Sequence, residues 1–155
     1  MRPIASFQVD HDFIVPGMYI SRIDGDVITY DLRTRVPNAG DFMSDLTMHS
    51  VEHMVATLIR NSAIASSVLY FGPMGCQTGF YLLVRNDVEP KKVYSTLLTV
   101  LEDVLVQPQM FGQERKACGN YLNLSLDAAK EECSTYLASL RARGANFTYP
   151  KGDLS

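Results

Sequence analysis

Tryptophan is absent from this sequence of 155 residues, and cysteine and histidine each occur only three times. Three cysteines are an odd number and do not form the disulfide framework of a small secreted scaffold. Free thiols suit a reducing compartment, so we expect a cytoplasmic protein whose cysteines are available for other chemistry.

Long hydrophobic runs are also missing. The first ten residues contain no apolar segment of the length found in signal peptides. The longest stretch without charge lies between Arg60 and Arg85, but serines, glycines and a proline interrupt it. This stretch predicts buried strands with a turn rather than a membrane span, so we expect no membrane association.

Neither sign of charge dominates the sequence. Lysine and arginine number 14, aspartate and glutamate number 17, and the formal net charge is −3. The basic residues are scattered and form no patch that could follow a phosphate backbone, so nucleic acid is not expected as a partner. The length fits a single domain over residues 1–155, which can bury roughly 68–70% of its unfolded surface without disulfides.

Alternating apolar and polar residues predict strands in the first part of the chain. Residues 19–23 and 27–33 follow this pattern around the turn signal Asp24-Gly25-Asp26. Two further strands are predicted over residues 68–71 and 80–84, with a turn at Gly72-Pro73-Met74-Gly75.

Three helices are predicted as well. The first begins at Ser44 or Asp45, the second at Pro90, and the third is capped by Ser125 and stopped by Gly144. Their apolar residues recur with helical spacing: Val51, Val55, Leu58, Ile59; Val93, Leu97, Val100, Leu101, Val104; Ala129, Cys133, Tyr136, Leu137, Leu140. We therefore expect an α+β, two-layer fold, in which helices pack on one face of a single antiparallel sheet of about four strands.

An H-x-x-E-H pattern, His49-Ser50-Val51-Glu52-His53, lies inside the first predicted helix. At about 100° per residue, His49 and His53 lie roughly 40° apart and one turn apart, where two imidazoles can bind one metal ion. Glu52 lies about 60° to the other side of His49, near such a metal without being its ligand, as a general base would. The apolar stripe faces another way, so the histidines point toward a cleft or an interface.

The same pattern also fits a helix with surface histidines, because five-residue patterns occur by chance. Two of the three histidines fall in it, which favours a metal site. Two histidines leave a four-coordinate site short of a protein ligand. Cys76, among glycines, and Cys118, in a predicted loop, remain open as that ligand, as reactive thiols or as inert packing. Cys133, on the inner stripe of the last helix, is a small buried hydrophobe.

Over most of its length the sequence resembles the S-ribosylhomocysteine lyase (LuxS-type) family of bacteria. Any one matching block is weak, but this order of blocks is specific. The blocks are Ser6 to His11, Tyr30-Asp31-Leu32-Arg33, Pro37-Asn38, His49 to His53, Pro73-Met74-Gly75-Cys76-Gln77-Thr78-Gly79-Phe80-Tyr81, and Cys118-Gly119.

The resemblance implies a role for each candidate residue in the metal and acid–base positions. His49, His53 and Cys118 match metal ligands, with one divalent metal per subunit, typically Fe²⁺, for which Zn²⁺ or Co²⁺ can substitute. Glu52 and Cys76 match an acid–base pair.

The resemblance further implies a substrate and an assembly. Ser6, His11 and Arg33 match residues that hold the ribosyl part of S-ribosylhomocysteine, and family members are homodimers with active sites at the subunit interface. The reaction moves a carbonyl along the opened sugar through enediolates and then eliminates homocysteine. The other product is 4,5-dihydroxy-2,3-pentanedione, the autoinducer precursor, in a branch of the activated methyl cycle. Such chemistry needs a Lewis acid on oxygen and a base on the proton.

The sequence departs from the family pattern in two places. Tyr70-Phe71-Gly72 replaces a block that usually reads acidic residue, isoleucine and serine, and Thr34 replaces an aromatic residue after the matched arginine, with Arg35 beyond. These changes affect the expected substrate pocket and not the metal or acid–base positions. The residues after Gly144 match nothing in the family.

Two other interpretations use the same motif. A zinc metallopeptidase with H-x-x-E-H on a helix would take a distant glutamate as its third ligand, for which Glu131 or Glu132 is conceivable. Glu131 projects away from the inner face of its predicted helix. A non-catalytic, metal-stabilised binding domain would need four protein ligands, and only three are matched.

Overall fold

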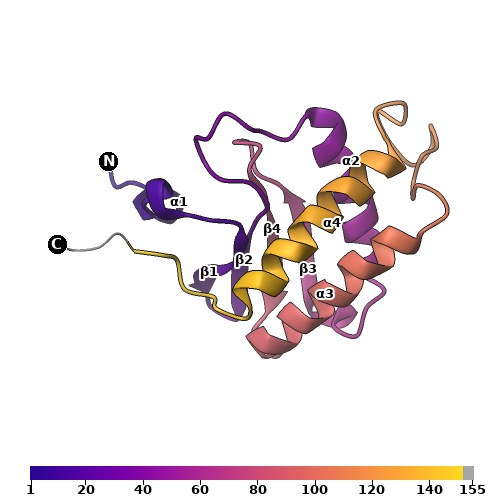
Figure 1. Cartoon of the computed structure of the whole chain (residues 1–155). Helices are drawn as coiled ribbons and strands as arrows, with labels where there is room; N and C mark the ends of the chain where they lie inside the picture. Colours follow the sequence, from indigo (N-terminus) through magenta and orange to yellow (C-terminus); the bar gives the residue numbers. More distant parts are fainter. Residues whose placement is uncertain (152–155) are drawn as a thin grey trace.

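In the computed structural model, which describes residues 1–151, four antiparallel strands form one sheet and long helices cover one of its faces (Figure 1). The last four residues of the predicted domain 1–155 lie outside the described part. The strands lie in the order β1 (Gly17–Asp24), β2 (Val27–Arg33), β4 (Gly79–Arg85), β3 (Val68–Pro73). The helices are α1 (Ala5–Gln8), η1 (His11–Phe13), α2 (Asp45–Ile59), η2 (Ala65–Ser67), α3 (Pro90–Val106) and α4 (Leu126–Arg143). The two-layer α+β prediction is confirmed.

The turns between paired strands follow the predicted signals, with one correction. β1 and β2 are joined at Gly25, whose φ of 60° favours glycine. The predicted turn at residues 72–75 begins too early, because Gly72 and Pro73 still belong to β3, where they pair with Tyr81 and Phe80 of β4. Proline is tolerated at the end of an edge strand, where its missing N–H leaves no ladder partner unsatisfied.

The helix ends lie where the capping residues predicted them. The Ser44 side chain accepts a hydrogen bond from the N–H of Thr47, which identifies Ser44 as the N-cap of α2. α3 begins at Pro90. The cap of α4 is Ser125, and the helix ends at Gly144 with a φ of 74°.

The core lies between the sheet and the helices. Alternate residues of β2, Ile28, Tyr30 and Leu32, face the helical layer together with Val51 and Val55 of α2. On α2 the stripe also includes Met54, which the spacing prediction omitted, whereas Leu58 is only half-buried.

The opposite face of the sheet has no long helix on it among residues 1–151. The alternate strand residues point there, including Thr29, Tyr70 and Tyr81, which line a hollow together with Ser6. The segment after α4 returns along β1, where the N–H of Ile20 donates to the carbonyl of Phe147. In Figure 1 this segment and α1 lie at the same end of the molecule. No helix in the described part of the chain has the length and apolar character needed to cross a membrane.

Candidate metal centre and active site

Three predicted ligands come together at the middle of α2. One nitrogen each from His49 and His53 and the sulfur of Cys118 all lie within 4.8 Å of one another. The two histidines occupy successive turns of α2, and their ring centroids are 4.6 Å apart. Cys118 comes from the loop between α3 and α4, and its Sγ lies 3.4 Å from Nε2 of His49. The structure thus brings Cys118 to the histidines, and Cys76 is not part of this group.

Backbone carbonyls orient both imidazoles for metal binding. Nδ1 of His49 lies 2.8 Å from the carbonyl oxygen of Asn123, and Nδ1 of His53 lies 2.9 Å from that of Phe111. A carbonyl accepts only from an N–H, so Nδ1 carries the hydrogen and Nε2 keeps its lone pair in each ring. Hydrogen bonds of this kind are typical of histidines that bind metal. The residues therefore fit a divalent transition metal held by two nitrogens and one thiolate.

The long loop between α3 and α4 is shaped around these side chains. Gly112 has a φ of 68°, and a Cβ there would lie 3.0 Å from Nδ1 of His53, so both conformation and space favour glycine. The N–H of Asn120 donates to Sγ of Cys118 at 3.4 Å. The loop backbone thus contacts the sulfur directly and helps to hold it beside the histidines.

Glu52 lies between the two histidines on α2 and is half-buried. Within residues 1–151 its carboxylate is not among the ligand atoms that lie within 4.8 Å of one another. Its role as an acid–base group beside a metal stays a prediction.

Cys76 is exposed on the turn between β3 and β4, where it contacts a buried polar network. Its Sγ lies 3.0 Å from Oγ1 of Thr78, and Nη1 of Arg33 donates to that same oxygen at 2.9 Å. Since Thr78 Oγ1 accepts from arginine, its own hydrogen is free to be donated to the sulfur. This arrangement lets the Thr78 hydroxyl point its hydrogen at the Cys76 sulfur.

Arg33 is only 3% exposed and is fixed by Asp31. Nε and Nη2 of Arg33 donate to the two carboxylate oxygens of Asp31 at 3.0 and 2.6 Å. Burial lowers the pKa of Arg33, but the hydrogen bonds and charge of Asp31 outweigh burial and raise the pKa overall, so the guanidinium stays charged. A two-point pair of this kind fixes the plane of the guanidinium.

The turn that carries Cys76 is fastened to the start of α2. Gln77 adopts a φ of 65°, which is unusual for a residue other than glycine. Its carbonyl accepts from the N–H of Met43 at 3.0 Å, and its side chain donates to the Met43 carbonyl at 2.9 Å. Met43 directly precedes the N-cap Ser44, so the turn and the histidine helix are joined by two short hydrogen bonds.

The remaining predicted substrate residues lie apart from the metal ligands. Ser6, on the short helix α1, lines the hollow on the face of the sheet opposite the long helices. None of His49, His53 and Cys118 lines that hollow. His11 lies in η1, where its Nδ1 is 2.8 Å from the carbonyl of Val9. The described chain therefore brings Arg33 and Cys76 together but leaves Ser6 and His11 on the N-terminal segment.

The sequence prediction missed several residues that support the site. Asn123 and Phe111 contribute only backbone carbonyls, which no residue-type pattern reveals. Asp31 could have been found, because it lies two residues before Arg33 on the same strand and so on the same face. Thr78 lies with Cys76 on the turn before β4, where no strand alternation indicates which side chains meet.

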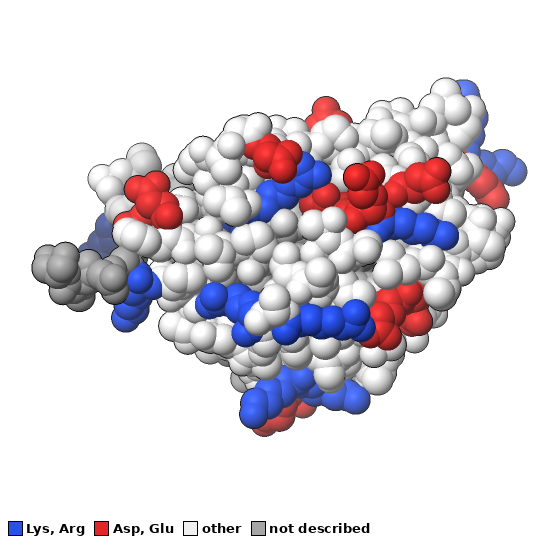
Figure 2. All heavy atoms as spheres, viewed as in Figure 1, with Lys and Arg blue, Asp and Glu red and all other residues white. Residues whose placement is uncertain are grey.

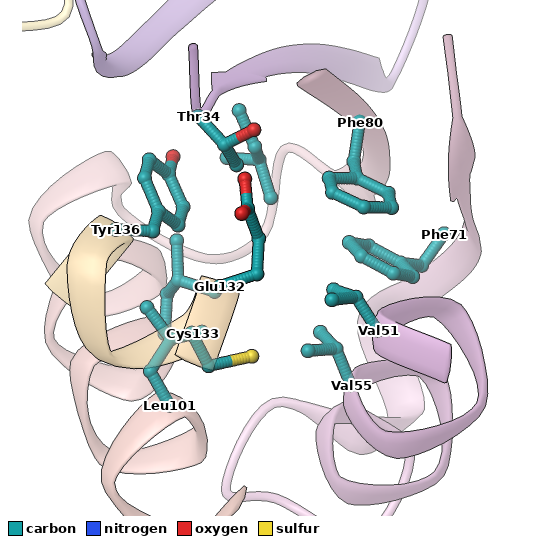
Figure 3. A pocket seen from close by; sticks show the side chains of 11 residues that line it. Thr34, Val51, Val55, Phe71, Phe80, Leu101, Glu132, Cys133 and Tyr136 are labelled. Carbon is teal, nitrogen blue, oxygen red and sulfur yellow. The ribbon is translucent and has the colours of Figure 1, made fainter. Parts of the chain in front are cut away.

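The departures from the family pattern have structural counterparts. Thr34 is buried and lies beside the Glu132 carboxylate at a core cavity of about 10 Å³, near the least volume that one water needs (Figure 3). Glu132 is 6% exposed and pairs with Arg35, whose Nη2 and Nε donate at 2.7 and 3.1 Å. In the Tyr70-Phe71-Gly72 block, which is the other departure, the Tyr70 ring lies over Gly72. A Cβ at Gly72 would clash with that ring.

Neither Glu131 nor Glu132 belongs to the group formed by His49, His53 and Cys118. Glu131 is exposed, and the carboxylate of Glu132 is engaged by Arg35. The group that lies beside the two histidines is the Cys118 thiol. The structure therefore does not favour the metallopeptidase interpretation.

Charges of both signs are intermixed on the surface. On the face shown in Figure 2, acidic and basic side chains lie next to one another in small groups. Ion pairs account for part of this pattern, including Arg35 with Asp41 at 2.7 Å and Arg141 with Glu102. Such exposed pairs contribute little to stability.

Comparison with known proteins gives matches along nearly the whole chain. The model of the S-ribosylhomocysteinase (LuxS) family matches residues 4–146. A protein from Borreliella afzelii, named S-ribosylhomocysteine lyase, is 38% identical, and the match covers 97% of this chain and all of that protein. A protein of the same name from Clostridium beijerinckii is 39% identical, over 97% of this chain and 99% of its own length. Another from Finegoldia magna is 36% identical, over 97% of this chain and all of its own length.

Proposed function

The chain belongs to the S-ribosylhomocysteinase (LuxS) family, and we propose that it is a cytoplasmic, homodimeric, Fe²⁺-dependent S-ribosylhomocysteine lyase. As a carbon–sulfur lyase it converts S-ribosylhomocysteine to homocysteine and 4,5-dihydroxy-2,3-pentanedione, the autoinducer precursor. The observation that carries this proposal is the cluster of His49, His53 and Cys118 in a chain matched to these lyases over 97% of its length. The three unpaired cysteines support a reducing compartment.

One divalent metal per subunit would be held by Nε2 of His49, Nε2 of His53 and Sγ of Cys118. Three protein ligands are typical of catalytic sites, whereas closed structural sites use four. When bound, the metal supplies a Lewis acid for an oxygen of the opened sugar. We assign Fe²⁺ as the resident ion because the family resemblance implies it, and this ligand set also accepts Zn²⁺ or Co²⁺.

Glu52 and Cys76 are the two groups that we assign to the proton transfers. After the ribose opens to its aldehyde, the carbonyl moves from C1 to C2 and then to C3. In each shift a base takes the proton from the carbon beside the carbonyl, and a proton is returned to the former carbonyl carbon after an enediolate. We assign proton transfer at one sugar carbon to the Cys76 sulfur. We assign proton transfers at the other carbons and at the hydroxyls to the Glu52 carboxylate.

The last step breaks the carbon–sulfur bond. With the carbonyl at C3, a base removes the proton from C4, a C4–C5 double bond forms, and the C5–S electron pair leaves with homocysteine sulfur. That sulfur takes up a proton, and the enol left at C4 and C5 gives up its hydroxyl proton and takes one up at C5 to become 4,5-dihydroxy-2,3-pentanedione. Arg33 and Thr78 support this step by holding the Cys76 sulfur in place through the Thr78 hydroxyl.

We assign Ser6, His11 and Arg33 to the ribosyl part of the substrate. Ser6 lies at the face of the sheet opposite the long helices, whereas the proposed metal ligands lie on α2 and on the loop between α3 and α4. A site that contains both groups is most simply built by two chains, which supports the homodimer.

Apolar side chains at that face support the same assembly. Phe7 on α1 is 75% exposed, Tyr70 on β3 is 51% exposed, and Ile4, just before α1, is also exposed. An obligate dimer interface buries on the order of 2,000 Å² or more in total and is largely apolar. We propose that a second copy covers this face.

Metal content and thiol release by the purified protein test the proposal. The full chain, prepared without oxygen, should contain about one divalent metal per subunit and release homocysteine from S-ribosylhomocysteine, measured with a thiol reagent. Removing the metal with a chelator should abolish release, and adding Fe²⁺ should restore it. A metal-loaded protein that releases no thiol from this substrate would refute the proposed function.

A further inference from the structure

The segment after α4 packs against the edge of the sheet and ends over buried polar residues. Besides the bond from Ile20 to the Phe147 carbonyl, the ring of Tyr149 stacks on that of Tyr19, with centroids 4.7 Å apart and planes 17° apart. Tyr149 lies beyond residues 4–146, the part of the chain that the family model matches. The match to the family model therefore does not extend to its contacts.

The hydroxyl of Tyr149 joins the pair that fixes Arg33. It donates to Oδ2 of Asp31 at 2.7 Å, the same oxygen that accepts from Nη2 of Arg33 at 2.6 Å. The Asp31 carboxylate, which is 1% exposed, thus accepts three hydrogen bonds, two from Arg33 and one from Tyr149. A buried carboxylate is stable only when its oxygens are satisfied in this way.

These contacts form a continuous path from the C-terminal segment to the reactive thiol. Tyr149 contacts Asp31, Asp31 holds Arg33 at two points, Arg33 donates to Thr78, and Thr78 contacts Cys76 at 3.0 Å. Each link is a direct hydrogen bond or sulfur–oxygen contact, and the central members of the path are buried.

We propose that Tyr149 is a positioning residue for Cys76, acting through Asp31, Arg33 and Thr78. The proposal rests on the proposed function in one respect, which is that Cys76 is the acid–base thiol. The phenol does not touch the reacting atoms. The phenol fixes the Asp31 carboxylate, and by sharing Oδ2 it reduces how far that carboxylate neutralises Arg33.

The direction of the effect follows from electrostatics. Because Tyr149 shares Oδ2 with Arg33, the Asp31 carboxylate neutralises the guanidinium less completely, and more positive field remains at Thr78 and Cys76. Without the phenol hydroxyl, Asp31 would pair with Arg33 alone and the Cys76 thiolate would be less favoured. Arg33 is the cation within this path, and Arg33 and Tyr81 both interact electrostatically with Cys76.

The test replaces Tyr149→Phe, which keeps the ring on Tyr19 and removes only the hydroxyl. In the metal-loaded full chain, iodoacetamide alkylation of Cys76 is followed by mass spectrometry of its peptide as a function of pH. The rate near pH 7 should fall about two- to tenfold, the range for one net hydrogen bond, and the profile should move to higher pH. The kcat for homocysteine release should fall with it, while metal content stays unchanged.

Tyr94→Phe is the matched control. Tyr94 donates its hydroxyl to the Leu140 carbonyl at 2.9 Å, within the helical layer. This variant should alkylate at the parent rate, so a loss limited to Tyr149→Phe supports the proposal. Parent alkylation and kcat in Tyr149→Phe, or a change in thermal stability alone, would overturn it. Alkylation needs no lyase turnover, so slowed alkylation in a chain that releases no homocysteine would reject the proposed function and retain the role of Tyr149.

Discussion

The backbone N–H of Ser125 donates to Oγ of Ser50 at 2.8 Å. Ser50 is fully buried in the H-x-x-E-H segment of α2, and its own hydroxyl donates to the Leu46 carbonyl at 2.6 Å. Ser125 is the N-cap of α4 and ends the loop that carries Cys118. One hydroxyl therefore fastens the loop with the third metal ligand to the helix with the other two.

Replacing Ser50→Ala should weaken both the fold and the metal site. The N–H of Ser125 would lose its partner, which costs about 1–3 kcal/mol of unfolding free energy when the group stays buried. Urea denaturation checks the stability, and competition with a chromogenic chelator checks the metal affinity, which should fall. Ser139→Ala on the outer part of α4 is the control and should change stability by no more than ~0.5 kcal/mol. Equal metal affinity in Ser50→Ala and the parent would contradict this role.

Removing the thiol of Cys118 should remove the metal. Cys118→Ala leaves two histidines, which are too few ligands to hold a divalent ion tightly. Elemental analysis after gel filtration should show a strong loss of metal. Cys133→Ala removes a buried thiol outside the cluster and should keep the metal, with a stability loss of roughly 1 kcal/mol for a small core truncation. Full metal occupancy in Cys118→Ala would refute the ligand assignment.

Glu52→Gln and Cys76→Ala should keep the metal and lose most activity. Each lacks a group that we assign to proton transfer, and the loss of a general base costs typically 10²–10⁴-fold. Rates of homocysteine release, with metal content measured on the same samples, check this. Cys76→Ala should also block deuterium exchange from solvent into the sugar carbons, whereas Cys76→Asp should retain some activity because a carboxylate can carry a proton. Exchange and elimination at parent rates in Cys76→Ala would leave the thiol without a chemical role.

A charge on the face of the sheet opposite the long helices should disrupt the proposed dimer. Tyr70→Lys places an ammonium where a second copy would pack, and desolvating it without a partner opposes association. Light scattering should show a larger monomer fraction and activity should fall with it. Val106→Lys, at an exposed apolar position at the end of α3, should remain a dimer. A parent protein that is monomeric and fully active would exclude the interface site.

The buried thiol of Cys133 should make stability depend on alkaline pH. Burial, followed by the negative charge of Glu132, raises the pKa of Cys133 from 9.0 to about 12. Between these values the unfolded chain releases the proton and the folded chain keeps it, so the unfolding free energy falls as pH rises. Denaturation at a series of pH values from 8 to about 10 should show this decline, and Cys133→Ala should flatten it. Parallel curves for the two proteins would show that Cys133 does not contribute.

Local sequence patterns were enough to predict the main strands and long helices and two of the three residues of the candidate metal site. The strand alternation, the caps Ser44 and Ser125, and the helical spacing of His49 and His53 are short-range features, and each is found in the structure. The period of an α-helix fixes which residues share a face without any knowledge of the rest of the fold. The family resemblance added Cys118, which residue spacing alone left open beside Cys76.

Only the tertiary structure showed which groups meet across long sequence distances. Cys118 contacts His49 across 69 positions, and Tyr149 contacts Asp31 across 118. The carbonyls of Asn123 and Phe111 orient the histidines through backbone atoms that every residue has. Such contacts depend on how loops close over a packed core, and the periodicity of a sequence carries no information about that closure. The sequence by itself therefore determined the chemistry that is available, and the packing decided which groups act together.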